Sequence, residues 1–318
     1  MTVLEFEKPI VQLETKIKEL RHFGSEENVK LDPGIRKLEA ELDKMRQEIY
    51  GKLTPWQRVQ IARHPDRPYT LDYIRMMMTD FMELHGDRQF ADDLALIAGF
   101  ARLEGRKVMV MGHQKGRDTK ENVMRNFGCA HPEGYRKAMR LMRLAEKFQL
   151  PVVIFIDTPG AYPGIGAEER GQAQAIAENL KDMVEIKVPI VATIIGEGGS
   201  GGALGIGVAD RVSILQHAYY SVISPEGCAS ILWRNSVKAP QAAEALKINS
   251  EQLKEFGIVD AVIPEPLGGA HKNPDEVATH LQATLVQQIQ ELSAYSPEEL
   301  VDQRYQKYRG IGQYASRP

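Results

Sequence analysis

Residues 1–50 repeat apolar residues at steps of three and four positions, a pattern that predicts amphipathic helices. The apolar positions are Ile10, Leu13, Ile17 and Leu20, followed by Ile35, Leu38, Leu42, Met45 and Ile49. Turn-forming residues lie between the two groups, at 22–25 and 32–34, so we expect a helical hairpin. The second apolar stripe is long for a surface hairpin. We expect it to be buried against the main domain or, as we favour, against another subunit.

From residue 70 onward the pattern changes to one that predicts an α/β domain. Apolar positions over residues 70–81 predict a helix with Thr70 as its N-cap and Gly86 just past its end. The elements predicted next are a strand hairpin, 94–100 and 107–112 with a turn at 104–106, and a helix over 132–149.

Continuous apolar strands alternate with helices after residue 151. The predicted elements are a strand over 152–156, a helix over 168–183, a strand over 190–195, a short helix and a strand over 212–215. Such strands are buried on both faces, which is typical of a parallel sheet covered by helices. We therefore expect a helical hairpin over 1–55, one α/β domain over 70–265, and a C-terminal helical segment and tail over 266–318. Within that last segment, 274–292 is predicted to be helical and 310–318 to be loose.

Composition and charge narrow the class of protein. The chain has 318 residues, of which 43% are hydrophobic and 26% charged, values typical of a globular protein. A net charge of −3 offers no basic excess, so we expect no nucleic-acid partner. No stretch reaches the ~18 apolar residues that span a bilayer, and the N-terminus lacks the apolar core of a signal peptide. We expect a cytoplasmic protein without membrane contact.

Cys129 and Cys228 are the only cysteines, too few for a four-cysteine zinc site, so we expect no metal on this chain.

A glycine-rich run over 196–203 follows the predicted strand. Gly196, Gly198 and Gly201 match the dinucleotide motif G-x-G-x-x-G. However, only residues 203–209 are left for the crossover helix, and the next strand lacks the acidic residue that would hold a ribose, so we reject a nucleotide site. The run instead offers unhindered backbone N–H groups at the start of a helix, as an oxyanion hole requires. Close packing of helix on strand is the alternative use for these glycines.

Another glycine-containing turn, residues 157–164, follows the predicted strand over 152–156. Ligands of parallel sheets bind at the edge formed by the carboxyl ends of the strands. Because the two turns follow successive strands, we expect them to share a pocket. Glu168 and Glu169 either face this pocket or only cap the helix that they begin.

Several segments resemble one known family. They are 157–164 (DTPGAYPG), 167–172 (AEERGQ), 196–203 (GEGGSGGA), 221–227 (SVISPEG) and 264–271 (PEPLGGAH), with further matches at 67–73, 83–88, 112–116 and 125–128. In this order, and covering nearly the whole chain, they resemble the carboxyltransferase α subunit of bacterial acetyl-CoA carboxylase. The resemblance implies a crotonase-like fold built of ββα turns, with an N-terminal helical extension and C-terminal helices.

The resemblance also implies an activity and partners. Members transfer a carboxyl group from carboxybiotin, held on a biotin carboxyl carrier protein, to acetyl-CoA. The product is malonyl-CoA, and this is the first committed step of fatty acid biosynthesis. The family assembles as an α2β2 heterotetramer, in which the β subunit carries the zinc and the oxyanion hole that faces acetyl-CoA. ATP is used by the biotin carboxylase component, and this chain contains no G-x-x-x-x-G-K-[ST] motif of its own.

By the same resemblance, the backbone amides of Gly201 and Gly202 face the biotin oxygen. The other substrate-binding candidates come from the same two turns and are Gly198, Gly199, Ser200, Gly160, Ala161, Tyr162, Pro163 and Gly164. This reaction needs few titratable side chains from the protein. Loss of CO2 from carboxybiotin leaves a basic nitrogen on the cofactor, and that nitrogen takes the acetyl proton. The protein then has to supply proximity and stabilisation of charged oxygens.

Two other functions stay open at this stage. A hydratase or decarboxylase of the crotonase superfamily is the closest rival, but a hydratase needs carboxylates, and residues 201–206 contain none. Glu226 resembles the second acidic position of hydratases, although we expect it to cap the helix that follows Ser224 as N-cap. A non-catalytic scaffold would use the N-terminal helices for binding and the glycines for packing, which the dense glycine-rich strand ends disfavour.

Overall fold

The computed structural model describes residues 2–26 and 32–312, and within them eight strands form one mixed sheet. The strands are β1 (Met78–Glu83), β2 (Leu96–Leu103), β3 (Arg106–His113), β4 (Val152–Thr158), β5 (Ile190–Gly199), β6 (Arg211–Leu215), β7 (Tyr219–Ser221) and β8 (Ala261–Ile263). Their order across the sheet is β1-β2-β3-β4-β5-β6-β8, and β7 pairs with the end of β5. The pairs β1–β2 and β2–β3 are antiparallel and the later pairs are parallel, which confirms the predicted hairpin and parallel sheet.

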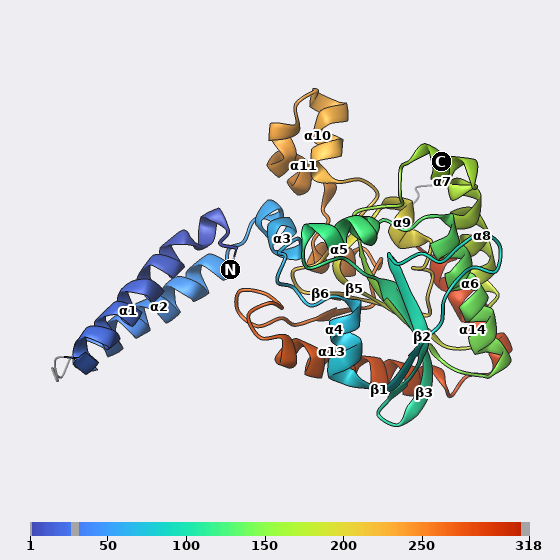
Figure 1. Cartoon of the computed structure of the whole chain (residues 1–318), viewed down its shortest axis with the longest axis horizontal. Coiled ribbons are helices and arrows are strands. Elements are labelled where there is room, and N and C mark those ends of the chain that lie inside the picture. Colours follow the sequence, from blue (N-terminus) through green and yellow to red (C-terminus); the bar gives the residue numbers. More distant parts are fainter. Residues whose placement is uncertain (1, 27–31, 313–318) are drawn as a thin grey trace, which may run out of the picture.

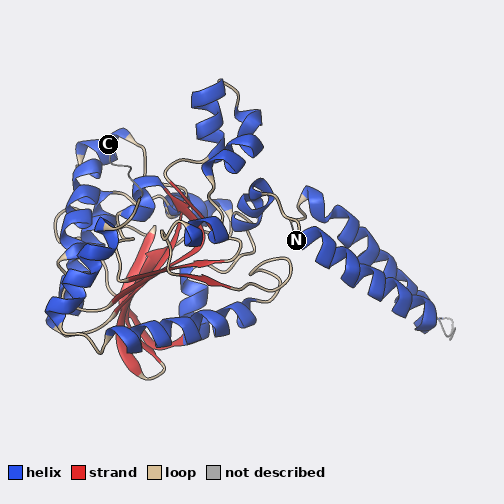
Figure 2. Ribbon diagram, turned by 180° about the vertical axis from the view of Figure 1, so that it is seen from behind, coloured by secondary structure: helices blue, strands red, loops and turns tan. Residues whose placement is uncertain are grey.

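Helices cover both sides of the sheet (Figure 2). They are α1 (Lys8–Glu26), α2 (Asp32–Tyr50), α3 (Pro55–Ala62), α4 (Thr70–Met77), α5 (Thr119–Met124), α6 (Pro132–Lys147), α7 (Ile165–Glu169), α8 (Gln172–Val184), α9 (Ser200–Leu204), α10 (Pro225–Trp233), α11 (Ala239–Leu246), α12 (Ser250–Glu255), α13 (Pro274–Leu292) and α14 (Pro297–Arg309). Short 3₁₀ helices are η1 (Glu5–Glu7), η2 (Asn126–Gly128) and η3 (Ser236–Lys238). Helices α6, α8 and α14 lie on one side of the sheet, and α4 and α13 on the other (Figure 1).

The core lies between these layers. Every residue of β4 and β5 is buried, as expected for central strands of a parallel sheet covered on both faces. The predicted helix over 274–292 is confirmed as α13, and its residues Val277, Leu281 and Leu285 belong to the same hydrophobic core as the sheet. No helix in the described part of the chain is long and apolar enough to cross a membrane. Of the tail predicted to be loose, 313–318 lie outside the described residues.

The helical hairpin of α1 and α2 projects from the body of the molecule (Figure 1). Ile17, Ile35 and Leu42 are buried in the seam between the two helices, so each helix covers the apolar stripe of the other. The expected burial of this stripe against the main domain is therefore wrong, whereas contact of the hairpin with another subunit stays a prediction. Residues 22–26 continue α1 instead of turning, and 32–34 begin α2; the rest of the predicted connection, 27–31, lies outside the described residues.

The helix predicted over 70–81 is wrong after Met77, and Gly86 follows a strand instead of ending a helix. Helix α4 ends at Met77 because Met78 and the residues after it pair with β2 as strand β1. Thr70 is also not the N-cap. Tyr69 occupies that position, while the Thr70 hydroxyl donates to the backbone oxygen of His113 at 2.5 Å.

The helix predicted over 168–183 is two helices, α7 and α8. Gly171 separates them with φ 82°, a left-handed conformation that favours glycine and interrupts a continuous helix. The helix predicted from residue 132 is confirmed as α6.

Candidate active site

The two glycine-containing turns, the first over 157–164 and the second over 196–203, lie side by side at one edge of the sheet. Strands β4 and β5 are parallel neighbours, and Thr158 pairs with Gly198 where they end. The register shifts between Ile156 and Thr158, which marks an irregularity at the start of the first turn. The structure thus brings together the two turns that the sequence placed at successive strand ends. The cavity beside residues 196–203, however, has no lining residue from 157–164, so it is not the pocket that the two turns were expected to share.

Strand β5 is longer than predicted, because Gly196 through Gly199 extend it instead of forming a turn. Strand β7 pairs with this extension, Gly198 opposite Tyr220. A Cβ on Gly198 would lie 2.8 Å from the Tyr220 ring, so glycine is what allows β7 to approach. Gly198 and Gly199 are therefore buried strand residues, and the chain turns only at Ser200, which is exposed and has φ 54°.

Gly201 and Gly202 are in the first turn of α9, which has five residues. Amides in the first turn of a helix have no intrahelical carbonyl to bind, so they are available to a ligand. Gly202 is buried against the other turn, where an added Cβ would lie 2.4 Å from the nitrogen of Ala161 and from the carbonyl carbon of Gly160. Gly201 is roomier, because its nearest neighbour would be the Ile176 side chain at 3.8 Å.

The rest of the first turn is shaped by local contacts. The Thr158 hydroxyl donates to the backbone oxygen of Gly160 at 2.7 Å. The Tyr162 ring stacks on His131 with centroids 4.1 Å apart, and it folds back over Gly164, where a Cβ would come within 2.3 Å of the ring. Pro163 is exposed. Gly160 and Ala161 therefore adjoin the Gly202 backbone, whereas Tyr162 and Gly164 pack toward the start of α6.

An apolar cavity of about 360 Å³ lies beside the second turn. Its lining includes Ser200, Leu204, Tyr220, Val222, Leu246 and Phe256. Apart from Ser200, sequence reasoning did not assign these residues to a site, because they come from separate segments that meet only when β7 pairs with β5. Val222 lies in the segment 221–227 of the resemblance, and Tyr220, Leu246 and Phe256 lie outside the segments that carry it.

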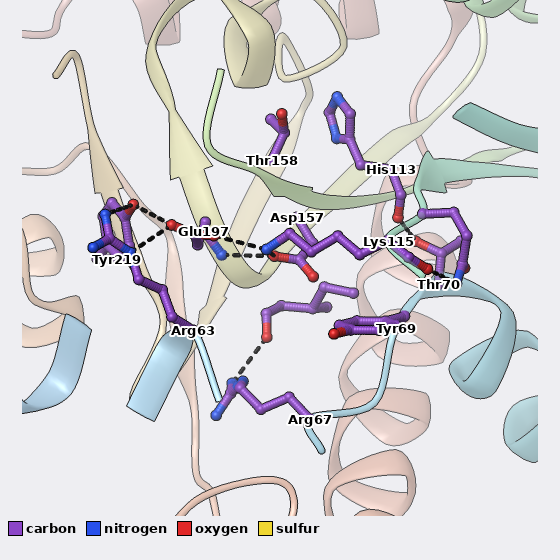
Figure 3. A network of polar contacts seen from close by, with 12 residues as sticks. Arg63, Arg67, Tyr69, Thr70, His113, Lys115, Asp157, Thr158, Glu197 and Tyr219 are labelled. Atoms are coloured by element: carbon purple, nitrogen blue, oxygen red, sulfur yellow. Dashed lines mark hydrogen bonds and ion pairs between the residues drawn. The ribbon is translucent and has the colours of Figure 1, made fainter. Parts of the chain in front are cut away.

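A buried cluster of charged groups lies beneath the turns (Figure 3). The Lys115 ammonium is 2.7 Å from Asp157 Oδ1 and 2.8 Å from Glu197 Oε1. Glu197 Oε2 accepts from Arg63 Nε and from the Tyr219 hydroxyl, both at 2.7 Å. The segment that contains Lys115 was noticed only as part of the resemblance, whereas Asp157 and Glu197 lie in the two turns found from their composition; no pairing among these residues was predicted.

The charges in this cluster stabilise one another. Burial alone would raise the pKa of Glu197, but Lys115 and Arg63 outweigh burial and lower that pKa to about 2. Burial alone would lower the pKa of Lys115, and the two carboxylates raise it above its ordinary value instead. Both groups are therefore ionised at neutral pH and are unsuited to exchanging protons with a substrate.

Acidic residues near the site have partners of their own. Ser224 is confirmed as the N-cap of α10, because its hydroxyl accepts from the Gly227 nitrogen at 3.1 Å. Glu226 Oε1 accepts from Arg63 Nη1 at 2.5 Å. We expected Glu226 to cap the helix, and this ion pair was not predicted. Glu168 and Glu169 are exposed on α7.

The structure also bears on metals and thiols. Among residues 2–26 and 32–312, no group of three or more His, Cys, Asp and Glu side chains is arranged to hold a metal ion. Cys129 and Cys228 are free cysteines, and burial raises the pKa of the Cys129 thiol to about 11. At neutral pH Cys129 is therefore a poor nucleophile.

Comparisons with known proteins show the family of the chain. The sequence model of the family "Acetyl co-enzyme A carboxylase carboxyltransferase-like" matches residues 3–312. The chain is 58% identical over 311 residues to acetyl-coenzyme A carboxylase carboxyl transferase subunit alpha of Thioalkalivibrio sulfidiphilus, covering 98% of each protein. It is 56% identical over 312 residues to the protein of the same name from Thermus thermophilus, covering 98% of this chain and 99% of that one.

Solved structures with low identity share the fold. The chain superposes on transcarboxylase 12S with a TM-score of 0.54 and 23% identity, over 71% of this chain and 44% of the other. It superposes on the Pseudomonas malonate decarboxylase hetero-dimer with a TM-score of 0.54 and 15% identity, over 68% of this chain and 90% of the other. These structural similarities confirm the crotonase-like α/β fold, and no conclusion about function rests on them. The family match and the curated relatives show that the chain belongs to the alpha subunits of the acetyl-CoA carboxylase carboxyltransferase, a transferase family that acts on acetyl-CoA.

Proposed function

We propose that this chain forms the biotin side of the carboxyltransferase site, with the backbone amides of Gly201 and Gly202 donating to the ureido oxygen of carboxybiotin. The observation that carries the proposal is the contact between the two glycine turns. Gly202 is fixed against Ala161 and Gly160, while the Gly201 position beside it stays open. Two adjacent amides on a fixed backbone are the form that an oxyanion hole takes in enzymes of acyl chemistry.

The neighbouring cavity fits the rest of the cofactor. Biotin has an uncharged fused ring and an aliphatic chain, and the cavity beside Ser200 is lined by Leu204, Tyr220 and Val222 with other apolar side chains. Its volume of about 360 Å³ is within the usual range for small-ligand sites. We place the ring at the mouth of this cavity, next to the amides of α9.

The remaining candidates serve this site in different ways. Gly198 and Gly199 keep β5 in contact with β7 and with the first turn, so they shape the site without touching the ligand. Ser200 lines the cavity, and Gly160 with Ala161 forms the wall behind Gly202. Tyr162, Pro163 and Gly164 form the outer part of the first turn, which we assign to contact with the incoming carrier or substrate.

Biotin, when bound, brings both the carboxyl group and the base that takes the acetyl proton. The chain's own contribution is therefore to hold the cofactor and to stabilise negative charge on its oxygen through backbone N–H groups. This division of labour agrees with the nearby acids: Asp157 and Glu197 are held in buried ion pairs. A hydratase would need such carboxylates free to activate water.

The partners follow from the proposed half-site. We propose an α2β2 heterotetramer in which the β subunit supplies the acetyl-CoA side and the zinc, with carboxybiotin delivered on the biotin carboxyl carrier protein. The biotin carboxylase component would consume the ATP and recharge the carrier. We further propose that residues 70–265 form the carboxyltransferase domain, between the hairpin over 1–55 and the C-terminal segment over 266–318.

Reconstitution tests the proposal. Malonyl-CoA decarboxylation in the presence of biotinylated carrier is measured with this chain alone, with the β subunit alone, and with both together. We expect turnover only with both, since each subunit supplies half of the site. Full turnover by either subunit alone would contradict the shared site.

A further inference from the structure

The buried charge cluster has no assigned role in the proposed chemistry, yet it joins the two turns that form the site. Its centre is the Lys115 ammonium, which contacts Asp157 and Glu197 at 2.7 and 2.8 Å. The three side chains are 12%, 4% and 8% exposed. An ammonium and two carboxylates removed from water in one place are costly to bury, so their retention calls for a structural reason.

Each carboxylate belongs to one of the turns. Asp157 immediately precedes Thr158 at the start of the first turn, and Glu197 lies in the glycine-rich end of β5. A direct bond links them as well, because the Glu197 backbone nitrogen donates to Asp157 Oδ1 at 2.9 Å. Lys115 thus bridges two segments that are separated by forty residues in the chain.

Further contacts hold Glu197 and cover Lys115. The Arg63 guanidinium and the Tyr219 hydroxyl hold the second oxygen of Glu197 (Figure 3). The stem of Lys115 is covered by Gly128, where an added Cβ would lie 3.0 Å from Lys115 Cγ and 3.1 Å from the backbone oxygen of Asp157. At φ 79° this position also favours glycine, so no side chain displaces the lysine.

The proposed site depends on the distance between the two glycine turns, which the bridge fixes. An added Cβ on Gly199 would lie 2.2 Å from the Pro159 oxygen, and one on Gly202 would lie 2.4 Å from the Ala161 nitrogen. The turns are therefore in direct backbone contact immediately beyond the bridge. A change in the separation of the two glycine turns would therefore change the direction of the Gly201 and Gly202 amides at the start of α9.

We infer that Lys115 is a positioning residue that holds the two glycine turns at the separation in which the Gly201 and Gly202 amides converge on the ligand oxygen. The inference rests on the proposed role of those amides. The Lys115 side chain is 12% exposed and its ammonium is paired with both carboxylates, so it acts through Asp157 and Glu197 and not by touching the substrate.

The test uses Lys115→Met in the complex reconstituted with the β subunit. Misplacing reacting groups by about 1 Å costs up to about 100-fold in rate, so we expect kcat to fall by about 10- to 100-fold. The KM for malonyl-CoA should stay within about twofold, because the acyl-CoA side of the site is on the other subunit. Lys115→Arg keeps the positive charge on a larger, planar side chain, so we expect its kcat to lie between that of Lys115→Met and that of the wild type.

Arg304→Met is the matched control. Arg304 is likewise a buried cation, paired with Asp210 at 2.8 Å, but it lies where β6 begins, at the opposite end of the sheet from the turns. We expect it to lower the melting temperature without changing kcat. Amide hydrogen exchange should accelerate over 157–164 and 196–204 in Lys115→Met, and not in Arg304→Met.

Two results would overturn the inference: kcat within about twofold of wild type in the assembled Lys115→Met complex, or equal losses of kcat in both variants. If Lys115→Met does not assemble, the charge-compensated pair Lys115→Met with Asp157→Asn decides by the same criteria. Gly201→Val is measured alongside. An active Gly201→Val overturns the oxyanion assignment itself, whereas an inactive Gly201→Val with an active Lys115→Met overturns only the role of the lysine.

Discussion

Gly202 and Ala161 are in backbone contact across the two turns, with room for no more than a hydrogen on Gly202: an added Cβ would lie 2.4 Å from the Ala161 nitrogen. Gly201, the neighbouring residue, would keep 3.8 Å to its nearest neighbour if it gained a Cβ. The two glycines are therefore not equivalent, and substitutions at them should separate folding from catalysis.

Gly201→Val should fold and assemble, yet lose carboxyl transfer. The side chain has space within the protein, but it projects beside the amide that the ligand must reach. Loss of one oxyanion donor lowers kcat by about 10²–10³-fold. Gly34→Val is the control, since Gly34 has no neighbour within 4 Å and lies in the hairpin. Wild-type turnover in a folded, assembled Gly201→Val complex would show that the site lies elsewhere.

Gly202→Ala should behave differently and destabilise the fold. Its Cβ meets backbone atoms of Ala161 and Gly160, which cannot rotate away as a side chain would. Overpacking of this kind costs roughly 1–3 kcal/mol, which denaturant unfolding of the purified chain can measure. Unchanged stability of Gly202→Ala would mean that the two turns are further apart than described.

The buried pair Arg67–Glu265 should make the fold sensitive to acid. Burial alone would raise the pKa of Glu265, but Arg67 outweighs burial and lowers that pKa to about 2 from its ordinary value of 4.5. A lowered carboxyl pKa contributes stability that is fully present above about pH 4.5 and is lost as the pH falls toward 2. Unfolding free energy measured over this range should therefore decrease with falling pH.

Glu265→Gln should flatten that pH dependence and weaken the fold at neutral pH. Breaking a buried ion pair costs roughly 3–5 kcal/mol, because the remaining charge is left unpaired. Glu255→Gln is the control, because Glu255 is exposed at the end of α12. An undiminished slope between pH 4.5 and 2 in Glu265→Gln would assign the acid sensitivity to other carboxyl groups.

The purified chain should hold no stoichiometric zinc. Its described residues contain no cluster of metal-binding side chains, and Cys129 and Cys228 cannot make a four-cysteine site. Elemental analysis after treatment with a chelator measures this directly, with the reconstituted complex as the positive control. One equivalent of zinc retained by this chain alone would contradict the expectation.

Periodicity predicted the elements whose apolar patterns are unambiguous, and it failed where tertiary pairing overrides a local pattern. Helix α6 and strand β4 are close to their predicted bounds, because one has a regular apolar face and the other is apolar throughout. Residues 78–83 carry a helical pattern that extends α4, yet pairing with β2 makes them a strand. Gly198 and Gly199 have low strand propensity, and pairing with β7, and of Gly198 also with β4, nevertheless holds them in β5.

The candidate site divides in the same way. The glycine turns could be found from sequence because their composition is unusual and they follow successive strands. The partners of Lys115 could not, since Asp157 and Glu197 lie 42 and 82 positions away and no local pattern states which charges meet. The cavity beside Ser200 escaped for the same reason, because its walls come from distant segments.

The hairpin provides the last prediction. Leu42 is 7% exposed in the seam between α1 and α2, whereas the sheet and its covering helices form a separate hydrophobic cluster. Leu42→Glu would bury an unpaired charge at a cost of several kcal/mol, so α1 and α2 should separate while the α/β domain stays folded. Limited proteolysis should then cut within residues 8–50 at protease concentrations that leave the wild-type hairpin intact. Lys44→Glu on the solvent side of α2 is the control, and it should leave the cleavage pattern unchanged. A Leu42→Glu chain that resists cleavage as the wild type does would show that the hairpin is stabilised by contacts other than this seam.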